Sequence, residues 1–286
     1  MESGVAASGS RVHDFSGYLL DSYGVFWGGG AVGALPGATG AMERLVDGGK
    51  IVGILSNSTQ LASSEIEKLR KHQISLGAHF HFLITSGEIA RSLFLKKELS
   101  FPTPRCTFYP FGENFEHLFQ GTSYSASQLD SADFIYIGVP RIDKKDQTDP
   151  MVFQDAVKQL VSSKLPMVCA NPDLFAHEGN PPQPMVRQGS IAKLYEEAGG
   201  TVYYIGKPAS MGFEWAMSEF VQREISDRKR VLMVGDTPET DIRGARRFGI
   251  ASALVTETGM MAERREKELP AGDSPDFMIR SLADAF

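Results

Sequence analysis

The chain has 286 residues, 42% of them hydrophobic, and its 29 basic and 35 acidic residues give a formal net charge of −6. This length and apolar content suffice for a sizeable core and exceed the usual size of one domain, so we expect two domains. The acidic balance, without a broad basic stripe, argues against a nucleic-acid partner.

Residues 1–14 are rich in Gly, Ser and Ala and hold no apolar core stretch, which predicts a flexible segment rather than a signal peptide. No run approaches the roughly 18 to 20 apolar residues of a membrane-spanning helix, so no membrane partner is expected. Cys106 and Cys169 lack metal-site spacing and suit a buried, small-hydrophobe role. We therefore expect a protein of the reducing cytoplasm.

The first apolar run, Tyr18-Leu-Leu, ends in Asp21 and is followed by Ser22-Tyr23-Gly24-Val25. An aspartate at a strand end is by itself more typical of a turn or cap than of a nucleophile. The glycines at 28–30 are not followed by Gly-Lys-Ser/Thr, which excludes a P-loop. A helix is expected over residues 38–46.

The second apolar run, residues 50–55, ends in Ser56 and Asn57, which alone would be interpreted as N-caps of the next helix. That helix is expected over residues 61–72, and a third strand over residues 82–84. This βαβα order is typical of a parallel sheet with helices on both faces.

The stretch from about 86 to 187 interrupts this order and is long enough for a domain of its own. We therefore predict a core domain formed by residues 15–86 and 188–286, and an inserted domain over 87–187. The inserted domain should contain helices at 88–97 and 150–162 and strands at 106–110, 134–138 and 166–170, before a proline-rich return at 180–184. The core should then resume with helices at 191–197, 213–223 and 240–248 and strands at 201–205, 231–234 and 251–255.

Two of these later core strands also end in polar residues. The strand at 201–205 leads to Lys207, and the strand at 231–234 leads to Asp236, with Asp241 five residues later. In an open α/β sheet, ligands bind beyond the carboxyl ends of the strands. Two acids there indicate a hard cation such as Mg²⁺. Four strands are thus expected to deliver Asp, Ser, Lys and Asp, in chain order, to one edge.

At these residues the chain resembles the haloacid dehalogenase (HAD) superfamily of phosphohydrolases. The four motifs that carry the resemblance are Asp21-Ser-Tyr-Gly-Val, Ser56, Lys207, and Gly235-Asp236 through Asp241. Further segments are similar to its class IIA, or NagD-like, branch, whose members are mostly small-molecule phosphatases: Leu35-Pro-Gly-Ala38, Ile84-Thr-Ser-Gly-Glu88, Asn171-Pro-Asp173-Leu and Ile205-Gly-Lys-Pro208. The resemblance implies a Rossmann-like α/β core and an inserted α/β cap of the C2 type.

The resemblance also implies a role for each motif residue. Asp21 would be the nucleophile that forms an aspartyl-phosphate, and Ser56 and Asn57 would bind the phosphoryl oxygens. Lys207 would bring a positive charge to the phosphate and orient Asp21. Mg²⁺ would be held by the Asp21 carboxylate, the backbone carbonyl of Tyr23 and Asp236, with Asp241 acting directly or through water.

The chain departs from the family at Tyr23, where these phosphatases usually carry a second aspartate that serves as acid and base. A tyrosine, with a reference pKa near 10, can donate a proton but is a poor acceptor at neutral pH. Our leading hypothesis is a Mg²⁺-dependent phosphomonoesterase acting on a small metabolite such as a sugar phosphate, nucleotide or phosphorylated cofactor. The alternative is a catalytically weakened HAD-fold protein that binds a phosphorylated ligand. The sequence leaves the substrate and the oligomeric state, a homo-oligomer included, open.

Overall fold

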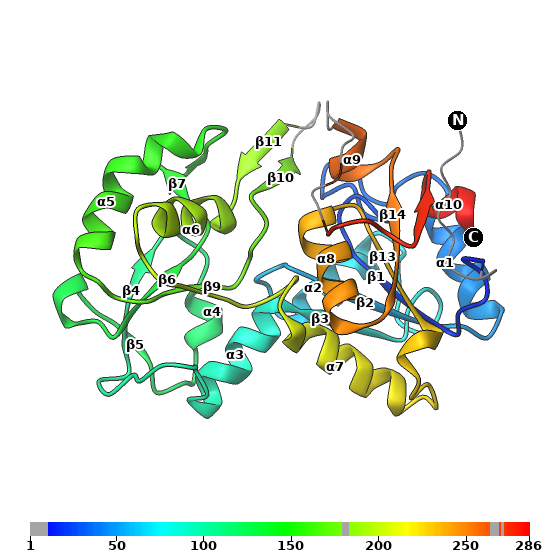
Figure 1. Cartoon of the computed structure of the whole chain (residues 1–286), viewed down its shortest axis with the longest axis horizontal. Coiled ribbons are helices and arrows are strands. Elements are labelled where there is room, and N and C mark those ends of the chain that lie inside the picture. The colour runs from blue at the N-terminus through cyan, green and yellow to red at the C-terminus, as the bar shows by residue number, and fades with distance from the viewer. Residues whose placement is uncertain (1–10, 179–182, 264–268, 270–271) are drawn as a thin grey trace. The chain divides into compact units, whose positions relative to one another are not determined.

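The computed structural model describes residues 11–178, 183–263, 269 and 272–286 (Figure 1). Most of the predicted flexible segment at 1–14, and part of the proline-rich return at 180–184, lie outside the described residues. The chain divides into two compact units. Unit 1 contains the residues up to Ser56 together with Ala62–Ile84 and Lys207–Phe286, and unit 2 contains Asn57–Leu61 and Thr85–Gly206.

Unit 1 is built on a six-stranded sheet in the order β15-β14-β13-β1-β2-β3. The strands are β1 Gly17–Leu20, β2 Ile51–Ser56, β3 Phe82–Thr85, β13 Val231–Gly235, β14 Ala251–Val255 and β15 Phe277–Ile279. The five strands from β15 to β2 run parallel. The four strands β1, β2, β13 and β14 are almost wholly buried, as expected when helices cover both faces of a parallel sheet, whereas the edge strand β15 is partly exposed.

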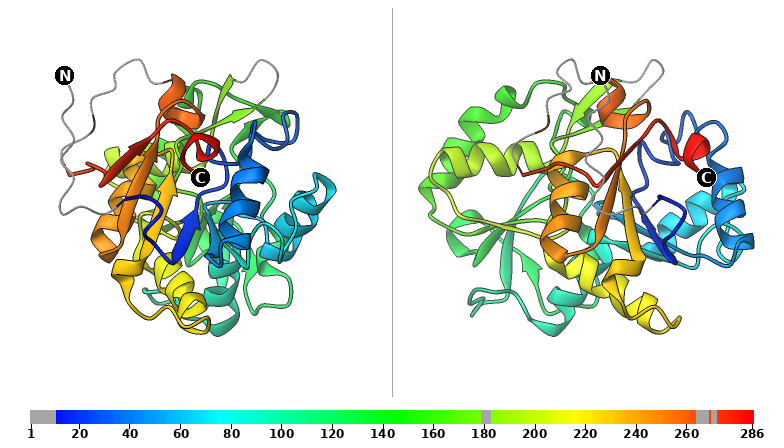
Figure 2. Two further views of the ribbon diagram at one scale, coloured as in Figure 1. Left: turned by 90° about the vertical axis from the view of Figure 1, so that its right-hand side faces the viewer. Right: turned by 45° about the vertical axis from the view of Figure 1, so that its right-hand side comes forward.

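Helices cover both faces of this sheet (Figure 2). One face packs on α1 Ala38–Asp47, α2 Ala62–Lys71 and α10 Leu282–Ala285, whose buried side chains share a core cluster with Tyr18 and Leu20. The other face carries α7 Ser210–Val221 and α8 Arg243–Phe248, which pack against each other. A Cβ built at Gly17 would lie 2.7 Å from the Phe220 ring, so glycine lets α7 approach the sheet closely.

The connections in unit 1 create a topological switch point between β1 and β13. From β1 the chain proceeds through β2 and β3 to one edge of the sheet, and then returns to build β13, β14 and β15 on the other side. Helices before and after such a point leave a crevice at the carboxyl ends of the two central strands, where ligands bind in folds of this class. Asp21 and Asp236 directly follow those two strands.

Unit 2 contains a five-stranded parallel sheet in the order β12-β9-β6-β4-β5. Its strands are β4 Thr107–Phe111, β5 Ser125–Ala126, β6 Phe134–Ile137, β9 Met167–Cys169 and β12 Val202–Tyr204. Its helices are α3 Ser86–Lys96, α4 Glu116–Phe119, α5 Gln154–Ser162 and α6 Gln188–Glu197. One face holds an aromatic cluster in which the ring centroids of Phe108 and Phe119 stack 3.8 Å apart.

Two hairpins of unit 2 were not expected from the sequence. They are formed by β7 Arg141–Ile142 with β8 Lys145–Asp146, and by β10 Phe175–Glu178 with β11 Gln183–Val186. The first has a two-residue turn, Asp143–Lys144, with positive φ at both positions. Such short strands carry too few residues for an alternating pattern to reveal them.

The α/β fold class predicted from the sequence is confirmed, but the expected place of one strand was wrong. The strand Val202–Tyr204 was assigned to the core, whereas it pairs with β9 in the sheet of unit 2, with Val202 opposite Met167. Residues 188–206 accordingly group with unit 2. An apolar run predicts a strand but not its partner, because pairing depends on contacts between residues far apart in sequence.

Some smaller expectations can also be compared with the structure. Cys169 is buried within β9, as predicted, whereas Cys106 before β4 is only half-buried. The helix expected at 240–248 is observed as α8, Arg243–Phe248, and the residues before it form a π-helical turn, Pro238–Ile242. No helix in the described part of the chain is both long and apolar enough to cross a membrane.

Candidate active site

Asp21 lies at the switch point of the unit 1 sheet. Its backbone N–H donates to the carbonyl of Val234, 2.9 Å away, which extends the β1–β13 pairing past the end of β1. Its side chain is 14% exposed, and its Oδ1 lies 2.6 Å from Nζ of Lys207. Asp21 is therefore held on one side by an ammonium group while its carboxylate keeps some access to solvent.

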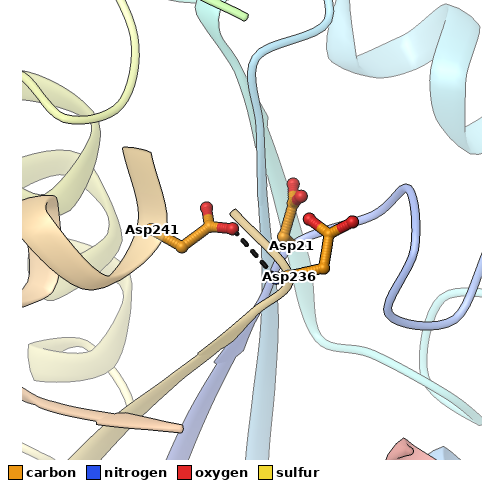
Figure 3. Close-up of side chains that lie close together, drawn as sticks. All are labelled: Asp21, Asp236 and Asp241. Carbon is orange, nitrogen blue, oxygen red and sulfur yellow. Dashed lines mark hydrogen bonds between the residues drawn. The ribbon is translucent and has the colours of Figure 1, made fainter. Parts of the chain in front are cut away.

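Asp241 is fixed beneath the end of β13. Its Oδ2 accepts the backbone N–H groups of Asp236 and Thr237, each at 3.1 Å, which explains the tight turn before α8 (Figure 3). A Cβ built at Gly235 would lie 2.3 Å from the Asp241 carboxyl group, so the close approach requires glycine at that position. Local sequence thus determines how the fourth motif folds back on itself.

Three carboxylates meet at this edge of unit 1 (Figure 3). Asp21, Asp236 and Asp241 each offer an oxygen atom, and these oxygens lie within 4.8 Å of one another. The ammonium group of the fully buried Lys207 lies between two of them, 2.6 Å from Asp21 and 2.8 Å from Asp241. With all four groups ionised, three negative charges face one positive charge, so a divalent cation would restore balance. Carboxylate oxygens are the ligands that Mg²⁺ prefers.

The pKa values of the two buried acids are raised by burial first and by the neighbouring carboxylates second. Burial raises the pKa of Asp236 well above its ordinary value, and the charges of Asp21 and Asp241 raise it further. Burial also raises the pKa of Asp241 to about 6, although the Lys207 ammonium opposes the rise. Deprotonating both acids is unfavourable without a cation, and metal binding would supply that compensation.

We expect the free energy of unfolding of the metal-free protein to fall as pH rises, because the pKa of Asp241 is raised in the fold. An acid whose pKa is lowered by a salt bridge would give the opposite dependence. The pKa of Asp241 is about 6 in the fold against 3.8 as its ordinary value, so the fold binds this proton more tightly than the unfolded chain does. The free energy of unfolding should therefore decrease as pH rises from about 4 to 6, by on the order of 1–3 kcal/mol. Denaturant titrations of chelated protein across this range test it, with Asp241→Asn as the control that should show a smaller decrease, because it keeps only the contribution of Asp236, whose pKa is also raised.

Ser56 and Asn57 directly follow one another but belong to different units. Ser56 ends β2 and is buried, and the register of Leu20 with Ile54 puts it at the same edge of the sheet as Asp21. Asn57 donates from Nδ2 to Oδ1 of Asp173 at 2.9 Å, and its carbonyl accepts the Ser86 hydroxyl at 2.8 Å. Asn57 is thus anchored within unit 2.

Asp173 was not identified from the sequence as a functional residue. Its only signal there was its place in the Asn171-Pro-Asp173 segment, which marks the resemblance without giving it a role. In the structure its backbone N–H donates to Oδ1 of Asn171 at 3.0 Å, while its carboxylate accepts from the Asn57 amide. This turn therefore sets the direction of the carboxylate that holds Asn57.

Tyr23 lies in the loop after β1, where its ring is half-buried and packs against the core cluster of unit 1. Nζ of Lys68, on α2, is 5.5 Å from the centre of this ring and 5.7 Å from that of Trp27, and it pairs with Glu65. Burial lowers the pKa of Lys68, but Tyr23 and Glu65 outweigh that effect and raise it overall. Lys68 therefore stays cationic beside the tyrosine ring. Sequence alone gave no signal for this contact, since Lys68 is one of several charged residues on α2.

Comparisons with known proteins show which proteins this chain is similar to. The HAD-hydrolase-like family model matches residues 204–285. Chronophin from Bos taurus is 30% identical over 288 residues. The match covers 94% of this chain and 91% of the relative. A haloacid dehalogenase-like hydrolase from Brucella suis 1330 has a similar solved structure, with a TM-score of 0.80 and 20% identity over 96% of this chain and 99% of that one. The structure of 4-nitrophenylphosphatase from Thermotoga maritima gives a TM-score of 0.67 and 23% identity over 95% and 96%.

Proposed function

Since this chain belongs to the haloacid dehalogenase superfamily and is a phosphatase of its class IIA, NagD-like branch, we propose that it is a Mg²⁺-dependent enzyme that hydrolyses a small phosphorylated metabolite through an aspartyl-phosphate. Sugar phosphates, nucleotides and phosphorylated cofactors are the candidate substrates. The observation that carries the proposal is the cluster of Asp21, Asp236 and Asp241 around the Lys207 ammonium at one edge of the unit 1 sheet.

The residues of this cluster fit Mg²⁺. In the proposed site the ion would be held by the carboxylates of Asp21 and Asp236 and the backbone carbonyl of Tyr23, with Asp241 acting directly or through water. The support is the donor set, which is all oxygen, and the raised pKa of the two buried acids, whose ionised forms are disfavoured by burial and by the neighbouring carboxylates and would be stabilised by a cation. When bound, the ion screens the repulsion between a phosphate dianion and the attacking carboxylate.

Asp21 is the proposed nucleophile. One of its oxygens bonds to phosphorus as the bond to the leaving oxygen breaks, and the leaving oxygen takes a proton. Water then attacks phosphorus and releases Asp21. The Lys207 ammonium, 2.6 Å from Oδ1, limits the rotation of the carboxylate and offers positive charge to the phosphoryl oxygens.

The remaining motif residues are proposed to bind the phosphate. The Ser56 hydroxyl and the Asn57 amide would donate hydrogen bonds to the phosphoryl oxygens. Asn57 is suited to this because Asp173 accepts from its amide and thereby fixes the orientation of its side chain. Ser56 is suited because it ends the strand next to β1.

We assign to the inserted unit the role of a C2-type cap that chooses among leaving groups. In the resemblance this role falls on residues 87–187, and the compact unit 2 is somewhat larger, because it includes Asn57–Leu61 and Thr85–Gly206. Its hairpins β7–β8 and β10–β11 are the segments most able to vary without disturbing the parallel sheet. A cytoplasmic location is proposed as well, supported by the free thiols of Cys106 and Cys169.

Protonation of the leaving oxygen is the step on which Tyr23 should have the largest effect. With tyrosine in place of the usual aspartate, aryl phosphates, whose leaving groups are stable as anions, should react much faster than alkyl phosphates. Tyr23→Asp should raise kcat/KM on alkyl phosphates by roughly 10²-fold, since one general acid contributes 10²–10⁴-fold. Steady-state rates on matched aryl and alkyl esters test this, with Tyr23→Phe as control. Equal wild-type rates on both ester classes would show that another group already supplies the proton.

The direct test of the proposal is hydrolysis of 4-nitrophenyl phosphate by purified protein with and without Mg²⁺, followed by a panel of phosphorylated metabolites. This aryl ester suits the purpose because a relative from Thermotoga maritima is named for its hydrolysis. Turnover that requires Mg²⁺ would support the proposed Mg²⁺-dependent phosphatase. Binding of phosphate esters without turnover would favour instead a ligand-binding protein on the same fold, a possibility raised by Tyr23.

A further inference from the structure

A short segment after β14, residues 256–260, crosses the loop that follows β1 in unit 1. The hydroxyl of Thr258 donates to the carbonyl of Gly24 at 2.5 Å. Gly24 and Gly259 face each other so closely that a Cβ on either would lie 2.6 Å from the Cα of the other. Both have positive φ, +76° and +62°, which glycine adopts without strain. The loop after β1 and this segment, which leads into helix α9 Gly259–Glu263, are therefore held together by one side-chain hydrogen bond and one contact between glycines.

This crossing encloses the carboxylate of Asp236. The backbone N–H of Met260 donates to Oδ2 of Asp236 at 2.7 Å, and a Cβ at Gly24 or Gly259 would lie 2.0 or 1.9 Å from that oxygen. The other oxygen, Oδ1, accepts the Thr237 hydroxyl at 3.0 Å. The orientation of Asp236 thus depends on where the 258–260 backbone runs, and not only on its own place after β13.

Thr258 bonds that backbone to the loop after β1. The Met260 N–H can reach Oδ2 only while the segment stays close to Gly24, and the Thr258 hydroxyl is the side-chain group that bonds the segment to that residue. A carboxylate that binds a metal is typically held by further hydrogen bonds, and loss of those outer contacts weakens metal binding without removing a ligand. The Thr258 hydroxyl itself is engaged with the Gly24 carbonyl, and Thr258 is not one of the three acids of the cluster.

We propose that Thr258 is a positioning residue for Asp236: by bonding the Gly24 carbonyl it holds the Met260 amide against Oδ2, and so it sets the affinity of the site for Mg²⁺. This inference rests on the proposed function, which makes Asp236 a metal ligand. It assigns to the segment after β14 a role in metal binding that none of its side chains would suggest.

Thr256 provides a matched control within the same segment. Its hydroxyl donates to the carbonyl of Ile279 at 3.1 Å, on the β15 side and away from Gly24. Thr256→Val and Thr258→Val therefore make the same chemical change two residues apart, each removing one hydroxyl hydrogen bond to a backbone carbonyl. Only the second should alter the position of Asp236.

The test is calorimetric titration of the metal-free, full-length protein with Mg²⁺. Thr258→Val should raise the Mg²⁺ dissociation constant by about 10- to 100-fold, which is the range observed when a hydrogen bond to a metal ligand is lost. Thr258→Ser, which keeps the hydroxyl, should restore the wild-type affinity, and Thr256→Val should leave it unchanged. On 4-nitrophenyl phosphate the Thr258→Val enzyme should need more Mg²⁺ yet reach nearly the wild-type kcat at saturation. If Thr258→Val does not fold, as judged by circular dichroism, Thr258→Ala takes its place as the variant without a hydroxyl.

A merely structural role for Thr258 would give a different result. Thermal unfolding of the metal-free variant would then show a lower Tm while its Mg²⁺ dissociation constant stayed at the wild-type value, and this would overturn the proposal. Equal losses of affinity in Thr256→Val and Thr258→Val would overturn it too. A wild-type protein that binds Mg²⁺ and hydrolyses the ester, beside an unaffected Thr258→Val, refutes only the positioning role. A wild-type protein that binds no Mg²⁺ refutes the proposed metal dependence as well.

Discussion

Asp21→Asn should lower kcat on 4-nitrophenyl phosphate by about 10⁴-fold or more, because the amide cannot act as the nucleophile that the proposed reaction needs. The fold should persist, since Asn has nearly the same shape and can still accept a hydrogen bond from Lys207, which lies 2.6 Å from Oδ1. Circular dichroism of the purified variant tests whether the fold persists, and single-turnover kinetics measure the loss of activity.

The control for this change is Asp47→Asn, which alters an exposed aspartate at the end of α1 and should leave kcat unaltered. With wild-type protein, rapid quenching in acid should trap a phosphorylated chain, and the modified peptide should contain Asp21. Substantial turnover by a clean preparation of Asp21→Asn, or a phosphorylated peptide elsewhere in the chain, would remove Asp21 from its proposed role.

Removal of divalent cations should abolish turnover, and added Mg²⁺ should restore it. Without the ion, three carboxylates with oxygens within 4.8 Å of one another face a single ammonium group, so a phosphate dianion would be repelled. Asp236→Ala should weaken the Mg²⁺ response more than Asp241→Ala does. The reason is that Asp241 is already engaged by Lys207 and by two backbone amides.

The measurement for this second prediction is kcat as a function of Mg²⁺ concentration in each variant, with chelated and reconstituted wild type as references. Asp227→Asn is the matched control, because Asp227 is exposed and its side chain accepts the Lys229 N–H in a surface turn. Full activity in rigorously chelated protein would contradict a metal-dependent reaction. A larger loss in Asp241→Ala would reverse the proposed order of the two acids.

Sequence alone was sufficient for most of unit 1. Its strands are short apolar runs, its helices have one apolar face, and these periodicities depend only on neighbouring residues. The positions of Asp21 and Asp236 follow from the same information, because each comes directly after a buried run, and the carboxyl ends of parallel strands share one edge of the sheet. Gly235 and Asp241 are likewise close in sequence, so the turn that joins them is a local matter.

What the tertiary structure decided concerns partners that are distant in sequence. The sequence of β12 does not indicate which sheet the strand joins, and in the structure it pairs with β9 of unit 2. Lys207, which contacts Asp21 and Asp241, therefore follows a strand of unit 2 and not a core strand. The hydrogen bond between Asn57 and Asp173 joins residues 116 positions apart.

The contacts of Tyr23 and Thr258 were decided in the same way. Lys68 meets the Tyr23 ring only because α2 packs beside the loop after β1, and the Thr258 hydroxyl meets Gly24 across 234 positions of the chain. Sequence patterns record whether a residue favours a helix, a strand end or the interior. They do not record which distant group it will contact, because that depends on the packing of whole elements and on the free energy of the complete fold.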